Sequence, residues 1–310
     1  MSEPALYLGF DIGGTNVRAA LGHGAEIVAS RTAVWPSGLA PADEVVFVAD
    51  LAHALIDESG QQMMVRAAGV ALAALTDRDG RVVDWPNRPA WRGLQFRSLL
   101  TDRLGLPTIV EDDANAAALA EYAVGSAQGF AHVVVITVGT GIGAGLILDG
   151  SLVRGRHGWA GELGHLVMQR DGPACACGHK GCLQMLASGR ALERIAVARG
   201  LLDAAALTEA AAQGEDWALE ALAESGRWLG LAAANVVNLL DLDAVVIGGG
   251  LSALDEPWWS ALQASLETNL LSPTERQVSL RRAMLPDTAG LLGALYLAQQ
   301  HKQQHSGEEQ

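Results

Sequence analysis

The stretch Asp11-Ile12-Gly13-Gly14-Thr15-Asn16 lies between two short apolar runs, residues 6–10 and 17–21. Short apolar runs joined by a tight turn predict antiparallel strands. A second stretch of the same kind, Gly139-Thr140-Gly141-Ile142-Gly143, separates the apolar residues 133–138 from residues 144–148. Because strand, Gly/Thr turn and strand occur twice in one chain, the sequence predicts a duplicated α/β domain.

Helical and apolar segments alternate between these two turns. Residues 41–56 have apolar side chains at helical spacing, and the apolar run 64–72 after them predicts a strand. A short strand at 108–110 runs into Glu111-Asp112-Asp113, and the helix formers of residues 114–124 follow. Since open α/β sheets bind ligands beyond the carboxyl ends of their strands, this acidic junction is a candidate site.

The second half is expected to be mainly helical up to its last strand. A helical tract covers residues 183–234 with a break at 214–216, and a strand at 244–247 opens onto Gly248-Gly249-Gly250. The last helix is expected at 291–299, and the polar residues 301–310 after it are expected to fray.

Charge and hydropathy exclude several classes of function. The 310 residues carry a formal charge of -14, which repels phosphate backbones and anionic lipids, so neither a nucleic acid nor a membrane is an expected partner. Residues 131–148 lack charged side chains and are long enough to suggest a membrane span, but glycines divide them into two strands. Residues 1–11 lack the features of a signal peptide, so a cytoplasmic location is expected.

The glycine turns are candidate phosphate sites, because backbone N–H groups can approach phosphate oxygens where side chains are absent. Asp11, just before the first turn, would hold a magnesium ion. The alternative is a tight hairpin, which is the better explanation of either turn alone. The candidate ATP-binding residues are Asp11, Gly13, Gly14, Thr15, Asn16, Gly139, Thr140, Gly141, Gly248, Gly249 and Gly250.

All three cysteines, Cys175, Cys177 and Cys182, fall within eight residues. Three cysteines cannot form a closed disulfide framework, and their clustering suggests a metal ion. The alternative is three reduced, buried thiols without a metal.

Five motifs follow one another along the chain: Asp11 to Thr15, Val110 to Asn115, Gly139 to Gly143, Glu162 to His165 and Cys175 to Cys182. Together they resemble the ROK family of sugar kinases and repressors, over nearly the whole chain. The resemblance implies an actin-like, hexokinase-like ATPase fold of two ribonuclease H-like α/β domains, with ATP and sugar in the cleft between them. The small domain would comprise residues 1–115 and a C-terminal helix at about 290–303; the large domain, 116–289, would carry a zinc loop at 165–182.

Asp113 is the expected general base, because a sugar hydroxyl attacks phosphorus poorly unless its proton has an acceptor. The resemblance assigns this role to the same position. The alternative is that Asp113 merely caps the following helix, a common role for aspartate.

The resemblance also implies a structural zinc ion and a set of sugar contacts. His165 with the three cysteines makes a Cys3His set suited to tetrahedral zinc. Asp112 and Gln184 stand where Asn and Glu are usual, and residues 71–75 lack the usual Pro-Gly turn. Asn87 and Trp91 resemble the family's usual Asn-x-Pro-x-Trp segment at the rim of the cleft. The alternative for Trp91 is a place in the core. The expected sugar contacts are Asn87, Asp112, Glu162, His165 and Gln184.

The function implied is a magnesium-dependent kinase that moves the γ-phosphate of ATP to a hydroxyl of a hexose-like substrate. The candidate acceptors are glucose, an amino sugar such as N-acetylmannosamine or kanosamine, and a cyclitol. The protein is expected to form a homodimer. A non-catalytic sugar-binding regulator is the other class. A sugar-responsive repressor would need a DNA-binding domain ahead of a first strand that already begins near Leu6.

Overall fold

The computed structural model describes residues 5–60, 64–272 and 274–306 and divides the chain into two compact units. The first unit combines Met1–Gln128, Leu152–Ala160 and Asp287–Gln310, and the second combines Gly129–Ser151 and Gly161–Pro286. The two-domain boundary expected at residue 115 stays a prediction. The expectations for residues 1–4 and 307–310 lie outside the described residues.

The first unit is built on a five-stranded sheet in the order β3-β2-β1-β4-β7. β1 and β2 are antiparallel on either side of the first glycine turn, as expected, whereas β4 and β7 are parallel to β1. A separate two-stranded sheet, β5-β6, was not expected from the sequence. The strands are β1 (Leu6–Ile12), β2 (Asn16–His23), β3 (Glu26–Val34), β4 (Val65–Leu72), β5 (Leu75–Thr76), β6 (Val82–Asp84) and β7 (Thr108–Asp112).

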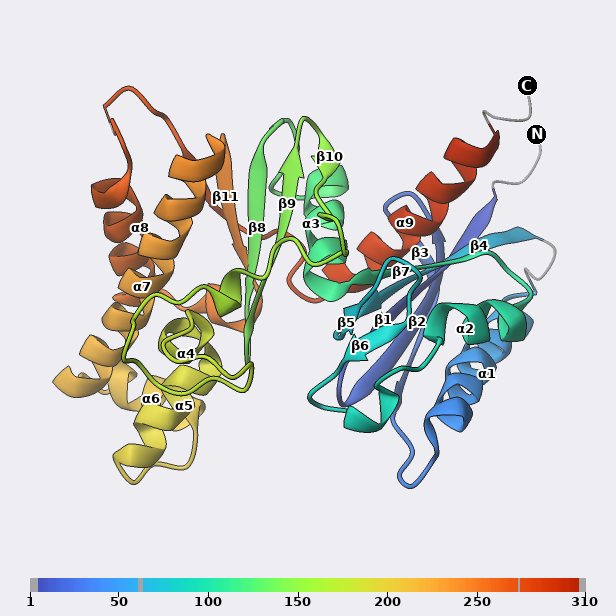
Figure 1. Ribbon diagram of the computed structural model, residues 1–310, viewed down its shortest axis with the longest axis horizontal. Helices are drawn as coiled ribbons and strands as arrows, with labels where there is room; N and C mark the ends of the chain where they lie inside the picture. Colours follow the sequence, from blue (N-terminus) through green and yellow to red (C-terminus); the bar gives the residue numbers. More distant parts are fainter. Residues whose placement is uncertain (1–4, 61–63, 273, 307–310) are drawn as a thin grey trace. The chain divides into compact units, whose positions relative to one another are not determined.

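Helices cover both faces of this sheet. Leu8 and Phe10 of β1 share a buried cluster with Val45 and Val48 of α1, whereas the alternate residue Gly9 faces the helix α9. α9 runs along the strands β1 and β4 in Figure 1. Residues 301–306, expected to fray, are helical. The helices are α1 (Pro41–Ser59), α2 (Phe96–Leu104), α3 (Asp113–Val124) and α9 (Ala289–Ser306), with the short 3₁₀ turn η2 (Pro89–Trp91).

Close backbone approach explains how α9 reaches the sheet. A Cβ on Gly69 of β4 would lie 1.9 Å from the carbonyl oxygen of Ala294 in α9. A Cβ on Gly293 would lie 2.0 Å from the carbonyl oxygen of Ala116 in α3. Only glycine fits at these two contacts, so α9 is held against both the sheet and the helix that follows β7.

The second unit repeats the strand order of the first. Its sheet runs β10-β9-β8-β11-β12, in which β8 and β9 are antiparallel and β11 and β12 are parallel to β8. Because both sheets follow the same order along the chain, the expected duplication is confirmed. The strands are β8 (Val133–Val138), β9 (Ile142–Leu148), β10 (Ser151–Leu152), β11 (Ala244–Gly248) and β12 (Ser279–Arg282).

The helical tract of the second unit has more breaks than expected and continues beyond residue 234. Ser188 separates two helices because its side chain caps the second, and residues 199–203 form another break. The longest helix reaches Leu240, and Gly226 within it lets the next helix approach. The elements are η3 (Leu163–His165), α4 (Gln184–Ala187), α5 (Gly189–Ala198), α6 (Ala204–Ala212), α7 (Asp216–Leu240), η4 (Gly250–Ala253) and α8 (Trp258–Asn269).

The apolar residues 131–148 form β8, the glycine turn and β9, as expected. In the part of the chain that the structure describes, no helix is both long and apolar enough to cross a membrane.

Candidate active site

The three carboxylates at the acidic junction between β7 and α3 differ in their exposure to solvent. Glu111 is buried, Asp112 is half-buried and Asp113 is exposed. Asp112 is the N-cap of α3, since its Oδ1 accepts hydrogen bonds from the backbone N–H groups of Ala114 (3.0 Å) and Asn115 (3.3 Å). The alternative role considered for Asp113, helix capping, therefore belongs to Asp112. Asp113 is the first residue of the helix, with its carboxyl in contact with solvent.

Glu111 was not recognised as part of this site from the sequence. Its Oε2 accepts a hydrogen bond from Arg154 Nε at 2.6 Å, and its Oε1 accepts from Asn115 Nδ2 at 3.0 Å. The backbone N–H of Asp112 also donates to Oε1, at 3.2 Å. Glu111 thus fixes the strand end and the first helical turn that carry Asp112 and Asp113. Three acids in succession were the available signal, but its partner lies 43 residues away.

The first glycine turn is closed by a hydrogen bond from Gly13 N–H to the Asn16 carbonyl, at 3.0 Å. Asp11 precedes the turn and lies 3.3 Å from Arg18 Nη1. Burial raises the pKa of Asp11, and the Arg18 charge partly offsets this effect. A Cβ on Gly290, in the first turn of α9, would lie 2.7 Å from Asp11 Cγ, so the carboxyl faces the positive end of that helix. A partly buried carboxylate beside exposed Thr15 and Asn16 suits a cation–phosphate site.

The second unit brings two of the glycine clusters together. Gly249 has φ of +79°, and a Cβ there would lie 2.6 Å from the carbonyl oxygen of Val138, the residue before Gly139. The turn at Gly139 and Thr140 is held by the start of α5, because the N–H of Gly189 donates to the Gly139 carbonyl at 2.8 Å. Gly139 and Gly250 have open space where a side chain would lie. These glycines therefore leave backbone accessible to a ligand.

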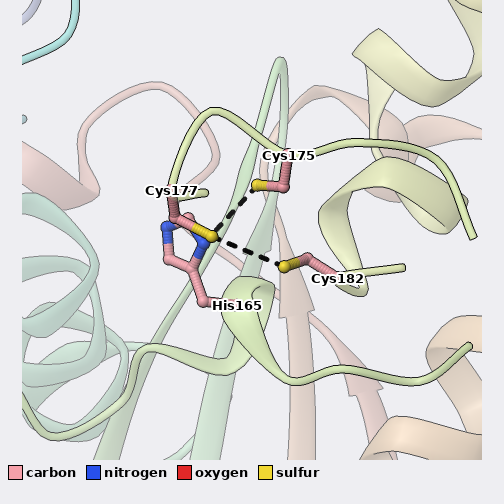
Figure 2. Close-up of side chains that lie close together, drawn as sticks. All are labelled: His165, Cys175, Cys177 and Cys182. Carbon is pink, nitrogen blue, oxygen red and sulfur yellow. Dashed lines mark hydrogen bonds between the residues drawn. The ribbon is translucent and has the colours of Figure 1, made fainter. Parts of the chain in front are cut away.

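The predicted zinc ligands come from the end of η3 and from the loop after it (Figure 2). The candidate ligand atoms of His165, Cys175, Cys177 and Cys182 all lie within 4.8 Å of one another. Cys175 Sγ is 3.8 Å from His165 Nδ1, and Cys177 Sγ is 3.6 Å from Cys182 Sγ. Spacing of this kind leaves room for one ion among three thiols and one imidazole.

The thiols of this cluster lie close enough together to change one another's pKa. Although burial opposes it, hydrogen bonds from the Cys177 backbone N–H and the Gln184 amide lower the pKa of Cys175 to about 6. Burial and the neighbouring thiols raise the pKa of Cys182 to about 12. A cation among the thiols would relieve this electrostatic conflict, because metals bind the thiolate form. The residues present therefore fit zinc.

Two expected sugar contacts are attached to this cluster. His165 directs Nδ1 toward the thiols, and its Nε2 lies 4.0 Å from Glu162 Oε2. Partial burial raises the pKa of Glu162, and His165 partly offsets the rise. Gln184 donates from Nε2 to Cys175 Sγ at 3.2 Å. A second histidine also lies near the cluster, with His179 Nδ1 3.5 Å from Cys177 Sγ.

The last of the five expected sugar contacts, Asn87, is exposed beside the first glycine turn. A Cβ on Gly14 would lie 2.8 Å from Asn87 Nδ2, so the two residues touch. Trp91 is fully buried and donates from Nε1 to the carboxylate of Glu44, so it is core, the alternative left open by the sequence. Asn87, Asp112 and Asp113 lie in the first unit, whereas Glu162, His165 and Gln184 lie in the second.

The ROK family model matches residues 7–301, and the chain belongs to this family. A kanosamine kinase from Amycolatopsis mediterranei is 35% identical over 250 residues, which cover 80% of this chain and 81% of that protein. A ROK hexokinase from Thermus thermophilus superposes with a TM-score of 0.88 at 34% identity, over 96% of this chain and 99% of that one. A ROK glucokinase from Streptomyces griseus, solved with glucose and AMPPNP, superposes with a TM-score of 0.79 at 33% identity, over 96% of this chain and 100% of that one. The fold is that of the hexokinase-like ATPases, as expected.

Proposed function

We propose that this protein is an ATP-dependent sugar kinase that transfers the γ-phosphate to a hydroxyl of a hexose or hexose-like substrate. Membership of the ROK family over residues 7–301 supports the reaction class. The observation that carries the residue assignment is the exposed Asp113 carboxyl at the start of α3, beside an Asp112 that performs the capping. A solvent-exposed carboxylate at a helix N-terminus is suited to accept a proton.

Asp113 is the proposed general base. As the sugar oxygen forms its bond to the γ-phosphorus, the bond from that phosphorus to the bridging oxygen breaks and ADP leaves. The hydroxyl proton passes to the Asp113 carboxylate, which releases it to solvent. Glu111 holds the junction through its bonds to Asn115 and to the Asp112 N–H, so Asp113 begins its helix at a fixed point.

The glycine turns are the proposed ATP site. Gly13 to Asn16 in the first unit, and Gly139 to Gly141 with Gly248 to Gly250 in the second, offer backbone N–H groups to phosphate or adenosine. Asp11 would hold magnesium, which when bound neutralises charge developing on the phosphates. Because burial raises the pKa of Asp11, a nearby cation would favour its ionised form.

His165, Cys175, Cys177 and Cys182 would hold a structural zinc ion, since four protein ligands leave no open position for water. Bound zinc would fix the loop geometry. Its ligand His165 would orient Glu162 through Nε2, and Gln184 would be oriented through Cys175. Asn87 and Asp112, in the first unit, are the other proposed sugar contacts. A cytoplasmic location and a homodimer stay predictions.

The first experiment screens the purified protein against sugars, amino sugars and cyclitols in a coupled ADP assay. Asp113→Asn should lower turnover at least about a hundredfold while AMPPNP binding persists, because general-base loss typically costs about 10²–10⁴ in rate. Asp102→Asn, an exposed aspartate on α2, is the matched control and should retain turnover. Sugar binding without any turnover in the unmodified protein would instead support the non-catalytic regulator.

An amino sugar is the second candidate acceptor. Asp112 stands where the family usually has Asn, and the kanosamine kinase is among the similar proteins. An ionised Asp112 only accepts hydrogen bonds, so a cationic amine would complement it better than a sugar acceptor atom.

Asp112→Asn with Gln184→Glu should shift preference toward glucose, measured as kcat/KM for glucose, glucosamine, N-acetylmannosamine and a cyclitol. The metal content of the variant must be checked, since Gln184 donates to Cys175. Glucose phosphorylation by the unmodified protein at about 10⁵ M⁻¹s⁻¹ or better would contradict this candidate.

A further inference from the structure

A group of buried aromatic side chains lies behind the first glycine turn. Trp35 follows β3, while Trp85 and Trp91 flank the exposed Asn87, and all three indoles are at most 8% exposed. Their rings meet edge to face, with centroids 5.7 Å apart for Trp35 and Trp91 and 4.8 Å apart for Trp85 and Trp91. Such contacts alone describe an ordinary aromatic core.

A buried ion pair within this core is not explained by packing. The Glu44 carboxylate, on α1, is 6% exposed and accepts hydrogen bonds from both Arg88 Nη1 and Trp91 Nε1. The Arg88 guanidinium lies over the Trp35 ring, 4.0 Å from its centroid. Buried ion pairs often stabilise a fold no better than apolar residues of the same volume. Arg88 Nε and Trp85 Nε1 are also buried without an acceptor among the described residues, a further cost.

Trp35 connects this core to the proposed phosphate turn. Its indole Nε1 donates to the Gly13 carbonyl at 2.8 Å, and its backbone N–H donates to the Thr15 carbonyl at 3.2 Å. These two bonds hold the turn at both ends of Gly14. The carbonyls of Gly13 and Thr15 are thereby directed inward, so the turn is ordered before any phosphate arrives.

Arg88 connects the same core to the proposed sugar contact. It follows Asn87 directly, and its own N–H donates to the Trp85 carbonyl at 2.9 Å. Asn87 in turn lies against Gly14, where a Cβ would come within 2.8 Å of its Nδ2. Glu44, Arg88 and Trp35 therefore form a chain of contacts that reaches both Gly13 and Asn87.

We propose that Glu44, Arg88 and Trp35 are positioning residues, which hold the phosphate turn and the Asn87 sugar contact as one preorganised body. The proposal rests on the proposed kinase function. None of the three touches the reacting atoms; each acts through Gly13 or Asn87. In this role, the buried ion pair holds the planar Arg88 guanidinium between the Glu44 carboxylate and the Trp35 indole.

The first test is Trp35→Phe, which keeps an aromatic ring and removes the N–H that holds Gly13. The matched control is Trp258→Phe in the second unit, because Trp258 is also fully buried and donates its N–H to Ser225 Oγ at 3.1 Å. Both variants should lose comparable thermal stability. Only Trp35→Phe should raise the KM for ATP, by about fivefold to twentyfold, since a buried carbonyl loses its donor. An unchanged KM for ATP in Trp35→Phe would overturn the proposal.

The second test separates positioning from stability. The double variant Glu44→Gln with Arg88→Met leaves no uncompensated buried charge, so its Tm should stay near that of the unmodified protein. Because the stacked guanidinium is lost, KM should still rise about fivefold or more for both ATP and sugar, with a smaller change in kcat. A normal Tm with normal KM values would show that the pair is only structural, and would overturn the proposal.

The same variants distinguish failure of this inference from failure of the proposed kinase function. If the unmodified protein phosphorylates no sugar, the kinase proposal fails, and AMPPNP binding by calorimetry replaces KM as the readout. Trp35→Phe should then weaken AMPPNP binding relative to Trp258→Phe. Equal AMPPNP affinities in the two variants would overturn the positioning role independently of catalysis.

Discussion

Arg154 and Glu111 form an ion pair, 2.6 Å from Nε to Oε2, between a short connecting segment and the acidic end of β7. The Glu111 side chain is 7% exposed, whereas that of Arg154 is 43% exposed. Arg154 belongs to residues 152–160, which join the first unit although the chain on both sides belongs to the second. Trp159 Nε1 also binds this segment to Thr76, through its carbonyl at 2.8 Å.

Removing Arg154 should destabilise the protein because Glu111 would remain as a buried carboxylate without a cation. We expect Arg154→Met to lower the free energy of unfolding by about 1–3 kcal/mol, less than for a fully buried pair because Arg154 is partly exposed. The measurement is urea unfolding in a double-mutant cycle with Glu111→Gln. The double variant should recover part of the loss. Additive losses in the two single variants would show that the pair is not coupled.

Because Asp112 caps α3, its replacement by alanine should lower the stability of the protein more than its replacement by asparagine. Asp112→Ala should destabilise the protein by about 1 kcal/mol because it removes the acceptor for the Ala114 and Asn115 N–H groups. Asp112→Asn keeps a capping oxygen and should cost far less, so its effect on sugar selectivity can be measured without loss of the helix start. Chemical denaturation of both variants tests this expectation. Equal stability of the alanine and asparagine variants would contradict the capping role.

The cysteine cluster predicts about one zinc ion per chain, measured by metal analysis of protein purified without added zinc. Cys177→Ser should lose the metal and weaken sugar binding more than AMPPNP binding, since Glu162 and Gln184 are attached to the cluster through His165 and Cys175. His179→Ala is the control, because His179 is outside the predicted ligand set although it lies near Cys177. An active preparation without metal would refute the structural zinc.

Arg18 should set the pH at which Asp11 becomes able to bind a cation. Burial raises the pKa of Asp11 and Arg18 lowers it, so Arg18→Met should raise that pKa further. The acidic limb of the kcat/KM profile for ATP with magnesium should therefore move to higher pH, and Arg18→Lys should move it less.

The stability of the metal-free protein gives an independent check on Asp11. Its pKa in the folded state lies above that in the unfolded state, so the folded protein binds more protons between the two values. This contribution favours folding below the unfolded pKa and is lost as pH rises through the interval. Arg18→Met should widen the interval, as seen in Tm against pH. An identical pH dependence with and without Arg18 would exclude this coupling.

The sequence predicted the elements of the fold that depend on residues close together in the chain. The two Gly/Thr turns identified the duplicated strand pairs, and apolar spacing over residues 41–56 predicted α1. Cys175, Cys177 and Cys182 were recognised as one cluster because close spacing limits how far apart their sulfurs can be. Short elements such as β5 and β6 were missed, since two or three residues carry no periodicity. The start of α3 shows the same limit: Asp112 and Asp113 are equally good caps by composition.

Tertiary structure alone decided which distant residues meet. Arg88 and Glu44 are 44 positions apart and Arg154 and Glu111 are 43, so no spacing rule joins either pair. The sequence by itself determined the α/β class, the duplication and the candidate phosphate, base and metal residues, because turns, helices and clustered ligands depend on near neighbours. The partners of Glu111, Trp35, Arg88 and Glu44 were decided by packing: a carboxylate or an indole N–H acquires its partner only when the chain has buried both groups in the same place.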